Sequence, residues 1–538
     1  MRRQAFQRGL VLLVVAYVVA TWWVFTRSTP IVAARPVTIR VAHWQIEKGP
    51  PDGLAAVIKR YEEINPRVKV EQVPVPGPLY RQWLRTNLTG GTATDIVEFA
   101  YFVQGVDDVP VRYFEPLTRD MEKPNPYNRG TVMEGVPWRK TFADNLSLMI
   151  TQSPEIGQIY GATLSQGSNR FFCNRALLEK ISGSPNPPKT FIEFRQLCRQ
   201  VADYSQRNQL KLHTLAGSRS NAQWIMEMLM QGCITGFNLE LDRGGMLSRT
   251  PPEAMEDYLQ GRWTSRRPEL RAAYSLMREV TQQMRPGFEQ LSRDDAVQEF
   301  VRGEALFILS GTYDATSLKR LAPFPVELMH MPQLTADDPV VGPYVWGPYS
   351  EGMIGTGMEM YLNKSSRHRD EALDFLRFLT SVEGGTLFMN HSGWLSAIRG
   401  VTVPPAIEVQ RASSEGYRTG AFYLGLGQAT SLSFTQNFHL LVTPQGSVDR
   451  FIDALELHMR EDARKDLVTD VRNKLTGVRA VDSEIAALNA LNRLQTSDAE
   501  RIDRGQTLVA NQTIAEQKLY ESTWVLERTA AVAKASSE

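Results

Sequence analysis

The stretch FFCNRALLEKISGSPNPPKTFIEFRQLCRQV, from Phe171 to Val201, governs how the rest of the chain is interpreted. Its first residues are aromatic, which favours a strand, and the following RALLEK is rich in helix formers. Three prolines then end that helix, because proline lacks a backbone N–H. Thr190 and Glu193 have the spacing of a capping box, which predicts the start of a second helix. The stretch therefore predicts a strand, a short helix and a longer helix.

The segment before this stretch alternates strands and helices. Val37–Gln45 has the alternation of a strand, and residues 54–64 carry apolar side chains at helical spacing. Residues 67–73 predict a second strand, and a third predicted strand ends at Phe99. A strand–helix–strand unit has parallel strands joined by a right-handed crossover. The first part of the chain is therefore predicted to be α/β and doubly wound.

The last part of the chain, after Pro444, contains no proline and is rich in helix formers. Because glycines interrupt it, three helices are predicted, at about Ser447–Thr476, Arg479–Arg504 and Thr507–Lys534. One of them carries a narrow apolar stripe, formed by Ile485, Leu488, Leu491 and Leu494. This stripe fits either a helical cap on the main body or a coiled-coil arm for a partner.

The N-terminus has the pattern of a membrane segment. Residues 9–25 contain no charged side chain, and arginines precede them. This length is just sufficient to span a bilayer, and the basic residues predict a cytoplasmic N-terminus with the rest exported. Residues 26–36 would form a linker. A signal peptide cleaved after Val32-Ala33-Ala34 is the alternative. No cysteine lies nearby, which excludes an anchor through a lipid-modified cysteine.

Composition and motifs exclude several classes of function. The chain has 60 basic and 59 acidic residues, so no basic excess indicates nucleic-acid binding. Three cysteines are too few for a disulfide scaffold. There is no phosphate-binding loop, no nucleophile elbow and no H-E-x-x-H motif, and the histidines lack metal-ligand spacing. The sequence accordingly predicts no catalytic residue, no metal and no cofactor.

Aromatic residues are placed where a ligand cleft would lie. Trp44 closes the first predicted strand, and Phe99 closes the third. In doubly wound sheets, ligands bind beyond the carboxyl ends of the strands. Aromatic faces there suit the apolar faces of sugars, while nearby polar groups bind the hydroxyls. Any one such residue has an ordinary explanation as a half-buried loop aromatic, but together they favour a ligand cleft.

Several motifs resemble those of a known family. FFCNRALLEK…PPKTFIEF resembles the YYNK-D-L-F-E-K…P-x-T-W-E-E-F signature of extracellular solute-binding proteins of ABC transporters, in the maltose-binding-protein-like group. TGGTATDIVEF is similar to A-S-G-x-x-P-D-V-V, and FVRGEALFILSGTYD resembles F-x-x-G-K-A-A-M-x-x-x-G-x-W. The resemblance extends from about Val37 to Met459, and its motifs occur in the family's order. Cys173 departs from it by replacing the usual tyrosine before Asn174.

The resemblance implies an α/β, two-lobe periplasmic-binding-protein fold of type II with a hinge and an interlobe cleft. A transmembrane helix would precede this fold, and an α-helical tail would follow it. The expected division is residues 1–36 for the membrane segment and linker, 37–164 with 325–366 for lobe I, 165–324 with 367–460 for lobe II, and 461–538 for a helical extension. The chain would cross between lobes near Ala162–Gly167, Leu321–Pro325 and Lys364–His368.

The family pattern also implies site residues. Tyr313 falls at the ligand-stacking tryptophan of the G-x-W motif, and Phe99 falls where an aromatic often stacks on the sugar. Asp95 matches the aspartate of the D-V-V motif, which is more often structural. The complete expected ligand-binding set is Trp44, Glu47, Asp95, Phe99, Asn221, Trp224, Tyr313, Trp346 and Trp394.

The function implied is capture of a carbohydrate or similar polar solute by hinge closure, followed by delivery to the permease of an ABC transporter. The protein would be extracytoplasmic, would bind its ligand without catalysis, and would be anchored by residues 9–25 or secreted after signal cleavage. One alternative is a membrane-anchored ligand receptor without transport. Another is a carbohydrate-active enzyme, which would need a pair of carboxylates facing the cleft.

Overall fold

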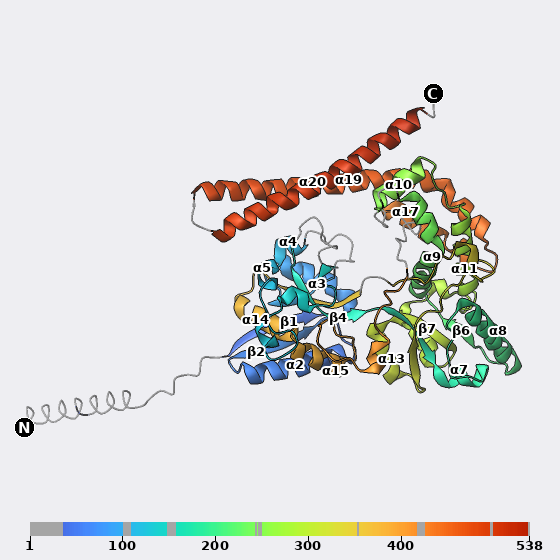
Figure 1. Ribbon diagram of the computed structural model, residues 1–538, viewed down its shortest axis with the longest axis horizontal. Helices are drawn as coiled ribbons and strands as arrows, with labels where there is room; N and C mark the ends of the chain where they lie inside the picture. Colours follow the sequence, from blue (N-terminus) through green and yellow to red (C-terminus); the bar gives the residue numbers. More distant parts are fainter. Residues whose placement is uncertain are drawn as a thin grey trace, which may run out of the picture.

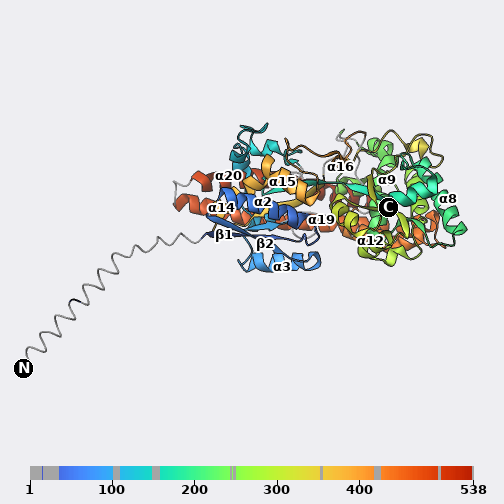
Figure 2. The same cartoon turned by 90° about the horizontal axis from the view of Figure 1, so that it is seen from below.

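Two α/β lobes lie side by side along the long axis of the molecule (Figure 1) (Figure 2). The computed structural model describes residues 15, 36–100, 109–147, 158–242, 245, 250–351, 355–416, 426–494 and 499–535. The predicted membrane segment, residues 9–25, lies outside these residues apart from Val15. Among the described helices, none has both the length and the apolar character that crossing a membrane requires.

The first lobe is built on a sheet with the strand order β2-β1-β3-β9-β4. The bounds are β1 Val37–His43, β2 Val68–Pro74, β3 Ile96–Glu98, β4 Gly161–Gly167 and β9 Gly355–Leu362. β1 pairs in parallel with both β2 and β3, as the predicted strand–helix–strand unit requires, and β9 pairs antiparallel with β3 and β4. The helices of this lobe are α2 Pro50–Ile64, α3 Gly77–Thr89, α4 Val109–Tyr113, α5 Thr118–Met121, α14 Arg369–Leu379 and α15 Val382–Ser392.

The second lobe is built on a sheet with the strand order β6-β7-β5-β8. Its strands are β5 Asn169–Asn174, β6 His213–Ala216, β7 Ala305–Gly311 and β8 Val326–Met329. Its helices before β8 are α7 Arg175–Ser182, α8 Phe191–Arg207, α9 Arg219–Leu241, α10 Pro251–Leu259, α11 Pro268–Thr281, α12 Arg293–Val301 and α13 Ala315–Leu321. Its later helices are α17 Gln428–Asn437, α18 His439–Val442, α19 Val448–Leu494 and α20 Ala499–Ala535, while the short α16, Pro405–Glu408, lies between the lobes in sequence.

The stretch from Phe171 to Val201 has the predicted structure. It forms β5, α7 and α8, and Gly183 ends α7 in the left-handed conformation. The capping box is confirmed: the Glu193 N–H donates to the Thr190 hydroxyl at 3.2 Å, and the Thr190 N–H donates to the Glu193 carboxylate at 3.2 Å. The apolar residues of this stretch belong to the core of the second lobe.

The lobe boundaries differ from those predicted beyond residue 324. β8 was expected in lobe I, but it pairs antiparallel with β5 in the second sheet. α14 and α15 were expected in lobe II, but Phe375, Leu376 and Phe388 lie in the core of the first lobe. The crossings expected near Leu321–Pro325 and Lys364–His368 are therefore wrong. The chain instead crosses between β8 and β9, and again after Ile398.

In the described part of the chain after Pro444, the structure has two long helices where three were predicted. Both predicted breaks lie inside helices, at Gly477 in α19 and Gly505 in α20. A glycine inside a helix costs only about 1 kcal/mol, which the packing of α19 against α20 can offset. The first half of α19 belongs to the core of the second lobe, so the predicted boundary at 461 divides one continuous helix.

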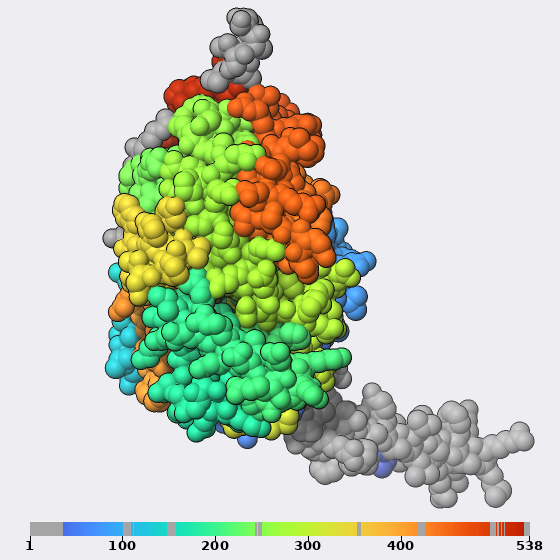
Figure 3. All heavy atoms as spheres, turned by 90° about the vertical axis from the view of Figure 1, so that its right-hand side faces the viewer, coloured from blue at the N-terminus to red at the C-terminus, as the bar shows by residue number. Residues whose placement is uncertain are grey.

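The predicted apolar stripe lies in the second half of α19, which packs against α20. In Figure 3, the orange surface of α17 and the first half of α19 is continuous with the green surface of the second lobe. The second half of α19 and the first half of α20 form an antiparallel hairpin that extends over the first lobe (Figure 1).

Candidate functional site

A cavity of about 280 Å³ lies between the lobes, beyond the carboxyl ends of β1 and β3. Its wall is formed from both lobes, since β1, β3, β4 and β9 belong to the first sheet and Thr312–Tyr313 follow β7 of the second. Four of the predicted aromatics line it, namely Trp44, Phe99, Tyr313 and Trp394. The polar residues of the wall are Gln45, Ser165, Gln166, Thr312 and Glu359.

The aromatics of the first lobe are held by edge-to-face contacts. The Trp44 and Tyr80 rings meet edge-on, with centroids 5.1 Å apart. Phe99 is buried and packs edge-on against Phe114 and Tyr361, at 5.3 Å and 5.2 Å. Such pairs prefer this geometry because the ring edge is positive and the face negative. On this side of the cavity, Trp44 and Phe99 are therefore both held by neighbouring aromatic rings.

Tyr313 is the aromatic side chain that the second lobe contributes to the cavity wall. Its side chain is 43% exposed, and the Arg293 guanidinium lies 5.4 Å from its ring centroid. Arg293 is ion-paired with Asp314, which also accepts a hydrogen bond from the Ser310 hydroxyl. One face of the ring is thus supported by a fixed cation, a cation–π arrangement.

The two lobes meet directly at the cavity. The Trp394 indole N–H of the first lobe donates to the main-chain carbonyl of Tyr313 in the second, at 3.1 Å. Nearby, the Thr316 hydroxyl donates to the Ser392 carbonyl at 2.8 Å. Interlobe hydrogen bonds therefore join the Trp394 side chain to the main chain of Tyr313 at the cavity.

A buried carboxyl group lies behind the polar part of the wall. The Gln45 side-chain amide donates to Glu98 at 2.7 Å, and the Trp44 N–H donates to the other carboxylate oxygen at 3.0 Å. The pKa of Glu98 is raised to about 8, chiefly by burial and in part by the nearby Glu359, against these two hydrogen bonds. Glu98 therefore orients Gln45 and the main chain of Trp44, and Glu359 is the carboxylate of the wall itself.

The backbone of β9 is strained where it borders the cavity. Met358 has a φ of 56°, which is rare for a residue with a bulky side chain. The preceding Gly357 has no room for a side chain, because an added Cβ would lie 2.5 Å from the Ser165 hydroxyl oxygen. The Ser165 hydroxyl donates to the Gly357 carbonyl at 3.0 Å. Strain of this kind is concentrated at functional sites.

The other predicted site residues lie elsewhere. Asp95 accepts hydrogen bonds from the Arg40 N–H at 2.8 Å and the Ser366 hydroxyl at 2.6 Å, which is a structural role. Asn221 is fully buried and its side-chain amide donates to the Leu309 carbonyl at 2.6 Å.

Three further predicted residues also lie outside this wall. Trp224 packs half-buried against the core of the second lobe, and Glu47 is exposed. Trp346 is 58% exposed and borders a different cavity, of about 630 Å³, beside α9.

Sequence reasoning missed most of the polar wall. Gln45 and Thr312 adjoin predicted aromatics, so their positions carried a usable signal. Gln166 and Glu359 lie inside strands, and no local pattern indicated that these strands border a cavity between lobes.

Three solved structures illustrate what the fold is similar to. The GacH receptor of Streptomyces glaucescens, studied unliganded and with acarbose, is 13% identical with a TM-score of 0.54, covering 80% of this chain and 99% of that one. Apo RafE from Streptococcus pneumoniae is 15% identical with a TM-score of 0.52, covering 80% and 99%. Maltose-bound MalE3 of T. maritima is 17% identical with a TM-score of 0.52, covering 78% and 98%. These likenesses show the two-lobe fold.

Comparison of the sequence with family models agrees with the fold. The comparison with curated proteins returned no significant match. A family model described as bacterial extracellular solute-binding protein matches residues 56–412, which is more than half of the chain. The chain therefore belongs to the bacterial extracellular solute-binding proteins.

Proposed function

We propose that this protein binds a carbohydrate in the interlobe cavity and delivers it to the permease of an ABC transporter. The observation that carries the proposal is the cavity wall, which combines four aromatic side chains with amide, hydroxyl and carboxylate groups from both lobes. Aromatic faces contact the apolar faces of a sugar ring, and the polar groups bind its hydroxyls. The proteins of similar fold named above were studied with acarbose and maltose, which are oligosaccharides.

The proposed mechanism requires no chemical reaction. Part of the wall comes from each lobe, so a ligand in the cavity contacts both lobes only when they are closed. Contacts made only in the closed form shift the population toward that form. The closed protein then presents surfaces of both lobes to the permease.

Binding is tested by isothermal calorimetry and thermal shift on the full chain, with maltose, raffinose and chitin oligosaccharides as probes. The detergent must carry no sugar headgroup, since a maltoside or glucoside would compete for the cavity. We expect saturable binding and a raised melting temperature with at least one oligosaccharide. Intact folding without stabilisation by any sugar would contradict the proposal.

Anchoring by residues 9–25 is a second part of the proposal, supported by their uncharged sequence and the arginines before them. The full chain should remain in the membrane fraction after alkaline carbonate extraction. A variant beginning at Pro36 behind a cleavable export signal should be released. Release of the full chain, together with a shortened mature protein, would instead support signal cleavage.

A receptor without transport remains the second candidate, and the α19–α20 hairpin favours it because it is a projecting surface. Sugar uptake by cells lacking this gene distinguishes a transport protein from a receptor. Loss of uptake, restored by the full chain, supports transport, whereas unchanged uptake with a lost transcriptional response supports the receptor. Absence of product from a bound oligosaccharide would support binding without hydrolysis.

A further inference from the structure

Three chain segments connect the two lobes. The first is Gly167–Asn169, between β4 and β5. The second leaves the second lobe after Tyr349, leads to β9 and contains Glu351. The third leaves the first lobe after Ile398, enters the second before Leu426, and contains residues 409–413. Relative movement of the lobes must change the backbone of all three segments.

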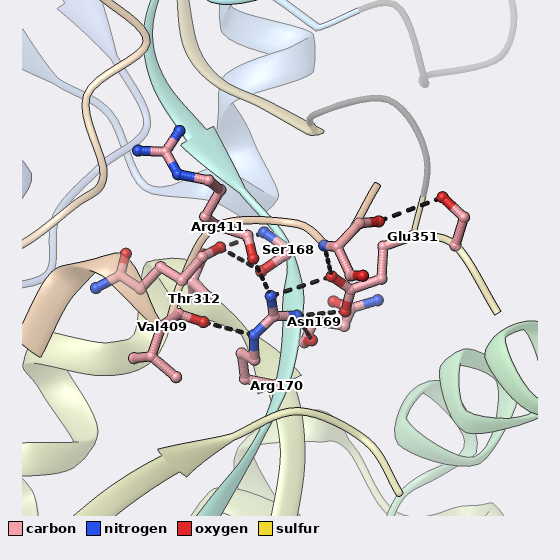
Figure 4. Close-up of polar contacts among 10 residues, drawn as sticks. Ser168, Asn169, Arg170, Thr312, Glu351, Val409 and Arg411 are labelled. Carbon is pink, nitrogen blue, oxygen red and sulfur yellow. Dashed lines mark hydrogen bonds and ion pairs between the residues drawn. The ribbon is translucent and has the colours of Figure 1, made fainter. Parts of the chain in front are cut away.

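Arg170, the second residue of β5, touches all three segments (Figure 4). Its side chain is fully buried. The Nε–H donates to the Val409 carbonyl at 2.7 Å, and one Nη1–H donates to the Asn169 carbonyl at 2.6 Å. The guanidinium also forms a two-pronged ion pair with Glu351 and donates to the Arg411 carbonyl.

This arrangement uses the complete hydrogen-bonding capacity of the guanidinium. An arginine has five N–H donors in a fixed planar fork, and each of those of Arg170 has an acceptor. Burying such a cation is favourable only when its geometry and its partners are this complete. We call Arg170, Glu351 and the carbonyls of Asn169, Val409 and Arg411 the Arg170 cluster.

The second and third segments are also joined to each other. The Glu351 carboxylate accepts a hydrogen bond from the Ser413 N–H at 2.5 Å. In the opposite direction, the Glu351 N–H donates to the Ser413 carbonyl at 2.9 Å. The cluster therefore holds the three segments to one another as well as to Arg170.

Short hydrogen-bonded paths connect the cluster to the cavity wall. Ser168 exchanges main-chain and hydroxyl hydrogen bonds with Thr312, which lines the cavity beside Tyr313. On the other side, the Gln410 side chain binds the Gly393 carbonyl at 2.9 Å and the Leu395 N–H at 3.3 Å. These two residues flank Trp394, so both interlobe aromatics depend on backbone that the cluster holds.

We propose that Arg170 is the positioning residue of the hinge, which sets the angle between the lobes by joining the three connecting segments. Arg170 does not line the cavity, so it acts on the ligand only through this angle. This role follows from the contacts of Arg170 with the three connecting segments and does not depend on the identity of the ligand. It can therefore be tested on the ligand-free protein, separately from sugar binding.

The test measures the distance between spin labels on the two lobes of the full chain. Lys59 of α2 and Gln206 of α8 are exposed and lie in opposite lobes, so both can be replaced by cysteine. The native cysteines, Cys173, Cys198 and Cys233, are all buried and should not react with the label. Pulsed electron–electron double resonance then gives the interlobe distance distribution.

Arg170→Met and Glu351→Gln are the test variants, and Arg195→Met is the matched control. Arg195 is also an ion-paired arginine, partly buried, and binds Glu279 and Asp338 at 2.6 Å each. Asp338 lies between Leu334 and Val341, which belong to the core of the second lobe, so this pairing does not join the two lobes. We expect Arg170→Met to widen the distribution and displace its maximum, and Glu351→Gln to act in the same direction. Arg195→Met should leave the distribution unchanged.

A double variant separates positioning from stability. Arg170→Met/Glu351→Leu removes the Glu351 charge that Arg170→Met leaves without its partner, so it should be more stable than Arg170→Met. If the cluster sets the angle between the lobes, the double variant should melt at a higher temperature than Arg170→Met. Its interlobe distance distribution should nevertheless stay displaced. Should Arg170→Met fail to fold, the interlobe distances of Glu351→Gln and of the double variant still test whether the cluster sets the angle. Distributions identical to that of the unchanged protein in these variants would overturn the inference.

Discussion

Tyr313 is the cavity aromatic that can be removed with least disturbance, since its side chain is 43% exposed. Tyr313→Ala should weaken sugar binding about tenfold or more, because the ring lines the cavity and is supported by Arg293. Trp346→Ala is the matched control, an exposed aromatic outside this wall. Calorimetry with the sugar found by screening measures both. Equal losses in the two variants would contradict the assignment of the site.

Glu98 should make the stability of the protein depend on pH. Burial raises the pKa of Glu98 from an ordinary 4.5 to about 8 in the folded protein. Between these values the folded protein retains a proton that the unfolded chain has released. The contribution of this proton to the free energy of unfolding is therefore complete below about pH 4.5. It falls by about 1.4 kcal/mol per pH unit as the pH rises and is lost once the pH has passed 8.

Chemical denaturation at pH 5.5 and 8.5 measures this effect. Glu98→Gln cannot ionise and should show a smaller fall in the free energy of unfolding between these values. The exposed Glu179→Gln variant, in α7 of the second lobe, should retain the full decline of the unchanged protein. A decline in Glu98→Gln as steep as that of the unchanged protein would show that another group is responsible.

At the scale of elements, α19 is part of the second lobe rather than an added tail. Phe451 is fully buried and packs edge-on against Tyr274 and Phe434. Phe451→Ala should reduce the free energy of unfolding by about 3–5 kcal/mol through the cavity it creates. Leu457→Ala, in the same helix but 75% exposed, should change it by less than about 0.5 kcal/mol. Urea denaturation of both variants provides the comparison.

Elements with strong local signals were predictable from the sequence. The capping box of Thr190 and Glu193 and the alternation of Val37–Gln45 are local patterns, and both produced the expected structure. The glycine stops failed because packing of α19 on α20 outweighs the local cost at Gly477 and Gly505. Local preference decides an element only where no long-range packing opposes it.

Lobe membership and the cavity wall were less predictable, because they depend on pairing between distant segments. Nothing local in PFPVELMHMP shows that β8 pairs with β5, about 150 residues earlier. The strand-end rule found Trp44 and Phe99 because it needs only the ends of parallel strands. It could not find Glu359, which reaches the cavity from inside an antiparallel strand.

At the scale of the whole molecule, Gly393 tests whether closure controls affinity. It has a φ of 74°, and an added Cβ would lie 2.5 Å from the Thr316 hydroxyl oxygen of the other lobe. Gly393→Ala should push the lobes apart, increase the radius of gyration in small-angle scattering, and weaken sugar binding by about tenfold or less. Gly393 does not line the cavity, so we expect this variant to weaken binding through lobe separation and not through a changed cavity wall.

Gly183→Ala is the control for backbone strain. Gly183 has a similar φ of 72°, but no atom lies within 4 Å of an added Cβ. This variant should lose about 1 kcal/mol of stability and keep the affinity and scattering of the unchanged protein. Weakened binding in both glycine variants would indicate that strain, and not lobe separation, lowers the affinity.

The route of the chain also has a consequence for the order of folding. The core of the second lobe contains Phe171 near its start and Val525, in α20, near the end of the described chain. The first lobe likewise needs Phe388, more than 340 residues after Ile39. Neither lobe can complete its core until almost all of its distant segments are present. Contacts so far apart in sequence slow folding, so the newly made chain should stay exposed to chaperones and proteases until its last long helix is delivered.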